Sequence, residues 1–171
     1  MALLTILKYG DKRLETPANI VEKIDENIKK IVQDIAETMY AAPGIGLAAT
    51  QVGIPLKIAT IDLSRGNEKN GLMVLINPKI VHQEGNVQEE EGCLSFPEIY
   101  APVSRPAKVV LHALNLEGQL VEITGEGLIA RAFCHECDHL NGILFFERMN
   151  SLTREMIKKQ IAKKMKQGEW Q

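Results

Sequence analysis

The segment His135–Gly142 reads HECDHLNG and places two histidines four residues apart, with a glutamate directly after the first. If the segment is helical, each residue advances about 100° around the axis, so His135 and His139 lie on one face with Cβ atoms about 5–6 Å apart. Two imidazoles placed in this way can bind one divalent metal ion. Glu136 lies to one side of that face, near a water molecule at the ion, whereas Cys137 lies about 200° from His135 and points away. The segment therefore predicts a helix that carries a metal site.

Two other interpretations of these histidines stay open at this point. Both can be hydrogen-bonded core residues without a metal, or the chain can be a zinc protease, since H-E-x-x-H on a helix is typical of that class. A protease needs a third ligand, but Phe145 occupies the position of a third histidine. Of the downstream glutamates, Glu147 follows a helix break too closely, and Glu155 and Glu169 lie in or beyond a basic segment. The protease interpretation is weaker for this reason.

Length and composition predict a single globular domain over residues 1–171. A chain of this length can bury about 70% of its unfolded surface, and its contents of 45% hydrophobic and 25% charged residues are ordinary for soluble proteins. Three cysteines without the spacing of a disulfide framework favour a reducing compartment. The sequence has no apolar run of about 18 residues, and its start lacks the features of a signal or transit peptide. We therefore expect a cytoplasmic protein that does not span a membrane.

The spacing of apolar residues predicts helices and strands in an irregular order. Helical spacing occurs in three segments, Asp25–Met39, Gly127–Asn141 and Ser151–Lys166. Strand-like patterns occur in five runs, 56–62, 72–78, 79–83, 108–115 and 119–124, of which the last two form a predicted hairpin. Three prolines make Pro97–Pro106 extended or looped. Because strands and helices do not alternate regularly, we expect an α+β fold with mostly antiparallel sheets around a central metal-binding helix, an N-terminal helix and a C-terminal helix.

A third metal ligand has to come from the cysteines or from the other two histidines. His82 and His112 lie in strand-like runs without acidic or thiol neighbours at ligand spacing, so we assign them structural roles. Cys134 and Cys137 form a C-x-x-C pair, but in mid-helix, where packing as small apolar residues is the favoured interpretation. Cys93 lies in EEEGCLSFP, just before the proline-containing segment. Its thiolate can complete a Cys/His/His set and leave a fourth position open, which is typical of a catalytic rather than a structural metal.

Three motifs resemble, in order, those of the peptide deformylase family: GIGLAATQ at Gly44–Gln51, EGCLS at Glu91–Ser95 and HECDH at His135–His139. The family patterns are G-hydrophobic-G-hydrophobic-A-A-x-Q, E-G-C-hydrophobic-S and H-E-hydrophobic-D-H. The usually aliphatic third position of the last motif is Cys137 here. The resemblance extends over essentially the whole chain. It implies a bacterial-type, metal-dependent hydrolase that removes the N-formyl group from the N-formylmethionine of newly synthesised polypeptides and releases formate.

The resemblance also implies a metal site. Cys93, His135 and His139 would hold one ion per chain, and Glu91 and Arg105 would form an ion pair behind the metal-binding loop. Two imidazoles and a thiolate suit zinc, iron, nickel or cobalt. The family implies Fe²⁺ as the physiological ion, with Zn²⁺, Ni²⁺ or Co²⁺ as substitutes.

Further roles implied by the resemblance belong to the reaction itself. Glu136 would act as general base toward the attacking water and then as general acid toward the leaving amine. The side-chain amide of Gln51 and the backbone N–H of Leu94 would stabilise the oxyanion together with the metal. Ile45 and Gly46 would lie near the substrate. The resemblance thus predicts a complete hydrolytic site.

Two sequence features bear on partners other than the peptide. The stretch GIGLAATQVG lacks the third glycine of a dinucleotide fingerprint and the Gly-Lys-Ser/Thr ending of a nucleotide loop, so we expect no nucleotide cofactor. Residues 152–171 contain six Lys or Arg and two Glu. A solvated helix face is the structural interpretation of this basic segment, and contact with the ribosome near the emerging chain is the functional one.

Overall fold

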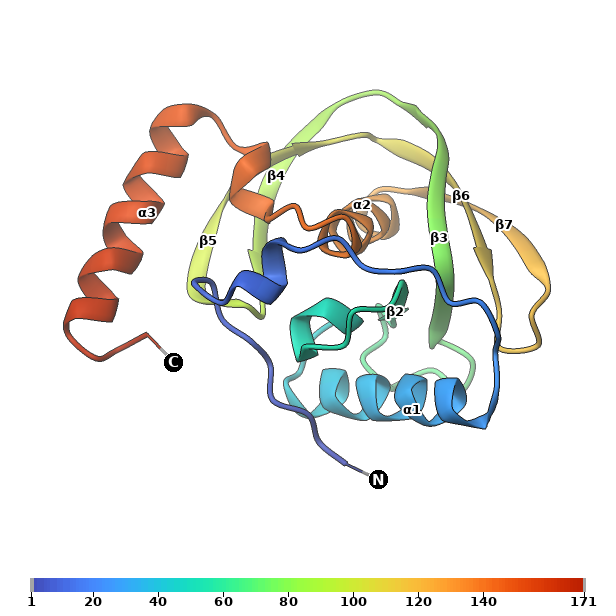
Figure 1. Ribbon diagram of the computed structural model, residues 1–171. Helices are drawn as coiled ribbons and strands as arrows, with labels where there is room; N and C mark the ends of the chain where they lie inside the picture. Colours follow the sequence, from blue (N-terminus) through green and yellow to red (C-terminus); the bar gives the residue numbers. More distant parts are fainter. Residues whose placement is uncertain (1, 171) are drawn as a thin grey trace.

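Residues 2–170, described by a computed structural model, contain three α-helices and seven strands, together with three short 3-10 helices (Figure 1). The α-helices are α1 (Glu26–Ala41), α2 (Leu128–Leu140) and α3 (Ser151–Lys166). The strands are β1 (Gly46–Ala48), β2 (Ile58–Ile61), β3 (Met73–Glu84), β4 (Val87–Cys93), β5 (Phe96–Arg105), β6 (Lys108–Leu114) and β7 (Leu120–Glu126). The 3-10 helices span Lys12–Glu15, Ala49–Val52 and Phe145–Arg148. The predicted α+β class is confirmed.

The strands form two antiparallel sheets. Five strands pair in the order β1-β2-β3-β6-β7, and β4 pairs with β5 in a separate two-stranded sheet. Figure 1 shows α2 almost end-on, enclosed by the curved strands, with α1 on the outside near β2. Strands of both sheets contact α2. The predicted arrangement of antiparallel sheets around a central helix is therefore present.

The helix boundaries follow from capping side chains. The Asp25 carboxylate accepts a hydrogen bond from the backbone N–H of Ile28 at 3.0 Å and begins α1. The Asn150 side chain does the same for the N–H of Thr153 at 2.8 Å and begins α3. Each cap satisfies a donor that the first turn of a helix leaves without a partner. All three predicted helices occur, with ends that differ from the prediction by at most two residues.

The strands differ from the prediction at β1, β3 and β4, of which β1 lies in the glycine-containing stretch where no strand was expected. The runs 72–78 and 79–83 form a single long strand, β3, with a register shift against β6 between Ile76 and Lys79, where Asn77 has a φ of 52°. This local kink made one strand resemble two. β4 was not expected at all, because most of its side chains are polar and its buried position is occupied by Glu91 rather than by an apolar residue.

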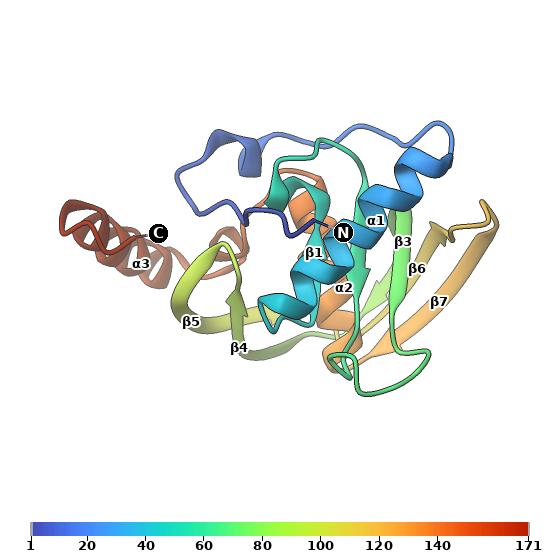
Figure 2. The same ribbon diagram turned by 90° about the horizontal axis from the view of Figure 1, so that it is seen from below.

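The central helix α2 is buried on nearly all sides, from Ala130 to Leu140. Phe133, Cys134 and Cys137 pack in a cluster with apolar residues of the five-stranded sheet. The C-terminal helix α3 is attached differently, since its Ile157 and Ile161 pack in a cluster that includes Phe96 and Phe145, and Figure 2 shows the rest of α3 extending away from the body. No helix within residues 2–170 has the length and apolar character that a membrane crossing requires.

Candidate metal centre

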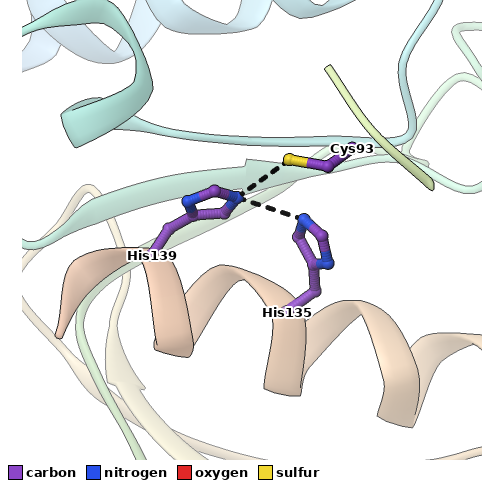
Figure 3. Close-up of side chains that lie close together, drawn as sticks. All are labelled: Cys93, His135 and His139. Atoms are coloured by element: carbon purple, nitrogen blue, oxygen red, sulfur yellow. Dashed lines mark hydrogen bonds between the residues drawn. The ribbon is translucent and has the colours of Figure 1, made fainter. Parts of the chain in front are cut away.

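Three donor atoms from two elements converge beside α2. Cys93 ends β4, and His135 and His139 lie one turn apart on α2 (Figure 3). The Cys93 Sγ atom lies 3.3 Å from Nε2 of His139, which lies 3.1 Å from Nε2 of His135. Within residues 2–170 these three side chains form the group suited to a metal ion, with ligand atoms within 4.8 Å of one another. One thiolate and two imidazoles at this spacing fit a tetrahedral ion with an open fourth position.

A hydrogen bond orients the imidazole of His135, and burial surrounds the imidazoles of both histidines. His135 donates from Nδ1 to Oε2 of Glu91 at 2.7 Å, which directs Nε2 toward the other two donor atoms. Burial lowers the pKa of His135, but Cys93 and Glu91 more than offset this, so that its pKa is raised overall. Burial, reinforced by the nearby His135, holds the pKa of His139 well below its ordinary value, so His139 is neutral. Because metal binds the neutral imidazole, His139 already has the form that a metal needs, whereas a metal ion would displace the proton from Nε2 of His135.

A buried ionic network supports His135 from behind. Glu91 accepts hydrogen bonds from Arg105 at 3.1 and 2.8 Å and from Nη1 of Arg131 at 3.0 Å, in addition to the one from His135. Arg105 also donates to Oδ2 of Asp138 at 2.6 Å. Burial raises the pKa of Glu91, but His135 and Arg105 outweigh burial and hold it below the ordinary range. The Glu91 carboxylate is therefore charged, and it fixes the imidazole of a candidate ligand.

Glu136 places a second carboxylate at the site. Its side chain is buried, and its Oε2 atom has no hydrogen-bond partner within residues 2–170. A Cβ atom added to Gly46 would lie 2.8 Å from Oε1 of Glu136, so a larger residue at position 46 would force this carboxylate to move. Burial raises the pKa of Glu136 to about 7. A buried oxygen without a protein partner, beside three metal donors, fits a water molecule or substrate atom at a metal site.

Gln51 and Leu94 supply further polar groups near Cys93. The Oε1 atom of Gln51 accepts from the backbone N–H of Ala48 at 3.0 Å. Its amide nitrogen donates to Oγ of Ser95 at 3.1 Å and lies 3.8 Å from Sγ of Cys93. Leu94 follows Cys93 in the turn between β4 and β5. The Gln51 amide is thus oriented with its N–H groups toward the end of β4.

These side chains share one cavity of about 570 Å³. It is lined by Ile45, Gly46, Gln51, Cys93, Leu94, His135 and Glu136 and by residues that include Lys8, Tyr100 and Leu128. Tyr100 is 66% exposed and Leu128 is 51% exposed, so both lie where the cavity opens to solvent. A cavity of this size accommodates a small ligand or one or two residues of a peptide.

A sequence model that describes polypeptide deformylases matches residues 3–155 of the chain. The chain belongs to the polypeptide deformylase family. The peptide deformylase of Syntrophobacter fumaroxidans is 48% identical over 168 residues, which are 98% of this chain and 99% of the relative. The peptide deformylase of Nitrosococcus oceani is 46% identical over 166 residues, 97% of this chain and 98% of the relative. The chain is therefore a deformylase, a hydrolase that removes the N-formyl group from nascent polypeptides.

Solved structures agree with the family assignment. The crystal structure of a peptide deformylase from Legionella pneumophila has a TM-score of 0.90 and 41% identity, and covers 98% of each chain. A peptide deformylase from Synechococcus elongatus, solved in complex with actinonin, has a TM-score of 0.88 and 40% identity over 93% of this chain and 88% of that one. Deformylases are metalloenzymes, and the Cys/His/His group is the candidate metal site of this one. The zinc-protease interpretation of the two histidines is therefore wrong.

The fold of the deformylase brings together all the site residues expected from the sequence, which are Ile45, Gly46, Gln51, Glu91, Cys93, Leu94, Arg105, His135, Glu136 and His139. The other candidate ligands lie elsewhere. His82 pairs with Glu84 at 3.2 Å and His112 with Glu122 at 2.7 Å on the strand surface, outside the metal group.

Sequence reasoning missed several charged residues of the buried network. Arg131 donates to Glu91 and to the carbonyl oxygens of Val87 and Val103. Asp138 accepts from Arg105 and from Arg148, which joins the end of α2 to the following 3-10 helix. The available signal was that Arg131 and Asp138 are charged and lie on the helix predicted to be central, where a buried charge requires a partner.

Proposed function

We propose that this enzyme hydrolyses the formyl amide of N-formylmethionyl peptides at the Cys93–His135–His139 centre, as a single catalytic domain over residues 1–171. The observation that carries the proposal is the convergence of three metal donors, the Glu136 carboxylate and the Gln51 amide at one cavity. A divalent ion held by Cys93, His135 and His139 would supply Lewis-acid chemistry, polarising the formyl carbonyl and lowering the pKa of water. Every other step is assigned to side chains and backbone groups of the chain.

Glu136 is the proposed proton carrier. Its carboxylate accepts a proton from the water that attacks the formyl carbon, and it gives the proton to the methionine nitrogen as the C–N bond breaks. The products are formate and a free α-amine. Two features support this role, namely the raised pKa of about 7, which burial causes, and the unpartnered Oε2 atom within residues 2–170. A carboxyl group that ionises near neutral pH can both accept a proton as a base and donate it as an acid.

Gln51 and Leu94 are the proposed donors to the oxyanion. The hydrogen bond from Ala48 N–H to Oε1 of Gln51 fixes which end of the amide faces the cavity. A donor held in advance at the place where charge develops lowers the barrier more than one that must reorient. The backbone N–H of Leu94, in the turn after Cys93, is assigned the matching position on the other side.

Ile45 and Gly46 are the proposed substrate contacts. β1 begins at Gly46 and lies at the edge of the five-stranded sheet, with β2 on one side. An edge strand offers unpaired N–H and C=O groups to an extended peptide. Both residues line the cavity that contains Glu136. This arrangement supports binding of the formylated chain as an added strand.

We assign Fe²⁺, one per chain, as the physiological ion, with Zn²⁺, Ni²⁺ or Co²⁺ able to substitute. The donor set of two imidazoles and one thiol sulfur supports any of these ions. The buried Glu91–Arg105 pair acts in this proposal by fixing His135 and the end of β4. A metal ligand held by an outer carboxylate in this manner binds its ion more tightly.

The proposed cellular setting is the cytoplasm, with nascent formylated chains as substrates. Three unbridged cysteines support a reducing compartment. We also propose contact with the ribosome through α3, whose lysines are mostly exposed and whose body extends from the rest of the fold (Figure 2). Phosphate-rich RNA is the type of surface that a basic helix binds.

Formate release from a formyl-Met peptide tests the proposed chemistry directly. Iron-loaded protein should release formate in step with new α-amines, and chelated apoprotein should release neither until iron is restored. An unformylated peptide mixture under the same conditions should show no new internal termini. Cleavage of internal bonds, or full activity of the metal-free protein, would contradict the proposal.

A further inference from the structure

A short N-terminal segment, Leu7–Tyr9, contacts both of the proposed oxyanion elements. The backbone N–H of Leu7 donates to the carbonyl oxygen of Gln51 at 2.7 Å. The backbone N–H of Tyr9 donates to the carbonyl oxygen of Ser95 at 2.9 Å. Gln51 lies in the 3-10 helix after β1, and Ser95 lies in the turn between β4 and β5. The segment therefore joins two elements that are more than 40 residues apart in the sequence.

Lys8 lies between these two backbone contacts and turns its side chain toward the same turn. Its Nζ atom donates to the carbonyl oxygen of Leu94 at 3.4 Å, and the side chain lines the substrate cavity. Burial lowers the pKa of Lys8, while the neighbouring Cys93 raises it. The Lys8 ammonium group thus holds the carbonyl end of the residue whose N–H end is the proposed oxyanion donor.

Tyr9 anchors the segment to the body of the fold. Its ring stacks on Phe96 with centroids 5.1 Å apart and an interplanar angle of 21°, and it meets Phe146 edge-on at 5.0 Å. Its carbonyl oxygen accepts a hydrogen bond from Nε1 of Trp170 at 2.9 Å. Tyr9 thus contacts β5, the 3-10 helix Phe145–Arg148 and the segment after α3. These contacts fix the backbone next to Lys8.

We propose that Lys8 is a positioning residue for the deformylation reaction. Its ammonium group holds the Leu94 carbonyl, so that the Leu94 N–H and the Gln51 amide keep the separation that a developing oxyanion requires. The inference rests on the oxyanion roles proposed above for Leu94 and Gln51. Small misplacements of groups that act in a transition state are costly, since about 1 Å can lower a rate by about 10²-fold. Lys8 therefore acts on the barrier rather than on substrate affinity.

The test compares Lys8→Met, which removes the ammonium group, with Lys8→Arg, which keeps a cationic donor. Lys12→Met serves as the matched control, because Lys12 is an exposed lysine four residues further along the chain. We expect Lys8→Met to lower kcat about tenfold, the effect of roughly one charge-assisted hydrogen bond, with KM within about twofold of wild type. Lys8→Arg should recover at least half of the lost kcat, and Lys12→Met should behave as wild type.

Two further measurements separate positioning from other roles. The absorption spectrum of the cobalt-substituted protein should be the same in Lys8→Met and wild type, because all three ligands remain. An altered spectrum would mean that Lys8 acts through Cys93 coordination, and it would overturn the proposal. A lower melting temperature with unchanged kcat would show a purely structural role, and a higher KM with unchanged kcat would show a substrate contact. Either result would also overturn it.

Gln51→Ala, measured in parallel, distinguishes failure of this inference from failure of the proposed function. If Gln51→Ala lowers kcat strongly while Lys8→Met does not, the oxyanion assignment stands and the role of Lys8 is refuted. If Gln51→Ala leaves kcat unchanged, the oxyanion assignment fails, and the role proposed for Lys8 fails with it.

Discussion

Replacing Glu91 by alanine should destabilise the fold by a predictable amount. The Glu91 side chain is 6% exposed and pairs with Arg105, which is 3% exposed. Removing one member of a buried ion pair typically costs about 3–5 kcal/mol, because the other charge remains buried. The lower end applies here, since Arg105 keeps Asp138 and Arg131 keeps two backbone carbonyls. A loss of about 3 kcal/mol corresponds to a melting temperature lower by about 6–12 °C for a chain of this size.

The same substitution should also weaken metal binding. Glu91 accepts the hydrogen bond from Nδ1 of His135 at 2.7 Å, which fixes the ring and its tautomer. Loss of an outer partner of this kind typically lowers metal affinity by about 10–100-fold. Since the imidazole is not itself removed, Glu91→Ala should still bind one ion at saturating metal. Lower affinity at unchanged stoichiometry is therefore the expected result.

Two assays measure these effects separately. Denaturant unfolding of chelated protein gives the stability without the contribution of bound metal, and competition with a chelator gives the metal affinity. Glu90→Ala is the matched control, because Glu90 is the next carboxylate on β4 and is exposed; its stability should stay within about 0.5 kcal/mol of wild type. If Glu91→Ala unfolds within about 1 kcal/mol of wild type and binds metal as tightly, the network does not support the site as argued.

Three further predictions concern the site itself. Glu136→Ala should keep a full metal equivalent and lose activity by at least about 10²-fold; near-normal turnover at saturating metal would exclude the general-base role. Gln51→Ala should lower kcat by about 10²–10³ with little change in metal content, and an unchanged kcat would refute the donor role. Cys93→Ala should lose the metal, whereas Cys134→Ala and Cys137→Ala should each cost about 1 kcal/mol of stability yet retain it. Burial raises the pKa of Cys134 to about 11 and of Cys137 to about 12. Iodoacetamide at neutral pH should therefore label Cys93 of the chelated protein before the other two cysteines. Labelling of Cys134 or Cys137 first would refute the assignment of these two as packing residues.

Local sequence patterns were sufficient to predict the three helices and the α+β class. The apolar residues from Ile28 to Met39 form the buried face of α1, so the helical spacing in the sequence matches the structure. The same holds for the two histidines of α2, whose spacing of four residues places them on one face whatever surrounds the helix. The third candidate ligand, Cys93, depends partly on the family resemblance, because no local rule relates positions 93 and 135.

The parts that sequence reasoning missed depend on long-range pairing. β4 was overlooked because Glu91 occupies its buried position, and a carboxylate in a strand normally indicates an exposed side. Its burial is possible because Arg105 and Arg131 approach from β5 and α2. The family resemblance identifies Arg105 as the partner of Glu91, but Arg131 is recognisable as a second partner only once β4 and α2 are in place. The role proposed for Lys8 could not be predicted for the same reason, since Lys8 and its partner Leu94 are 86 residues apart in the sequence.

The central helix explains how one short segment serves structure and chemistry together. Successive residues of an α-helix are about 100° apart, so five consecutive positions reach every side of the helix. In the segment from His135 to His139, the two histidines face Cys93, and Glu136 faces the Gly46 backbone. Cys137 packs toward the five-stranded sheet, and Asp138 meets Arg105. Because each face of the helix has a different partner, substitutions on different faces should affect different properties, namely metal binding, proton transfer or stability. Cys137 packs in an apolar cluster, so Cys137→Val should retain metal and activity, whereas substitutions of its neighbours should not retain both.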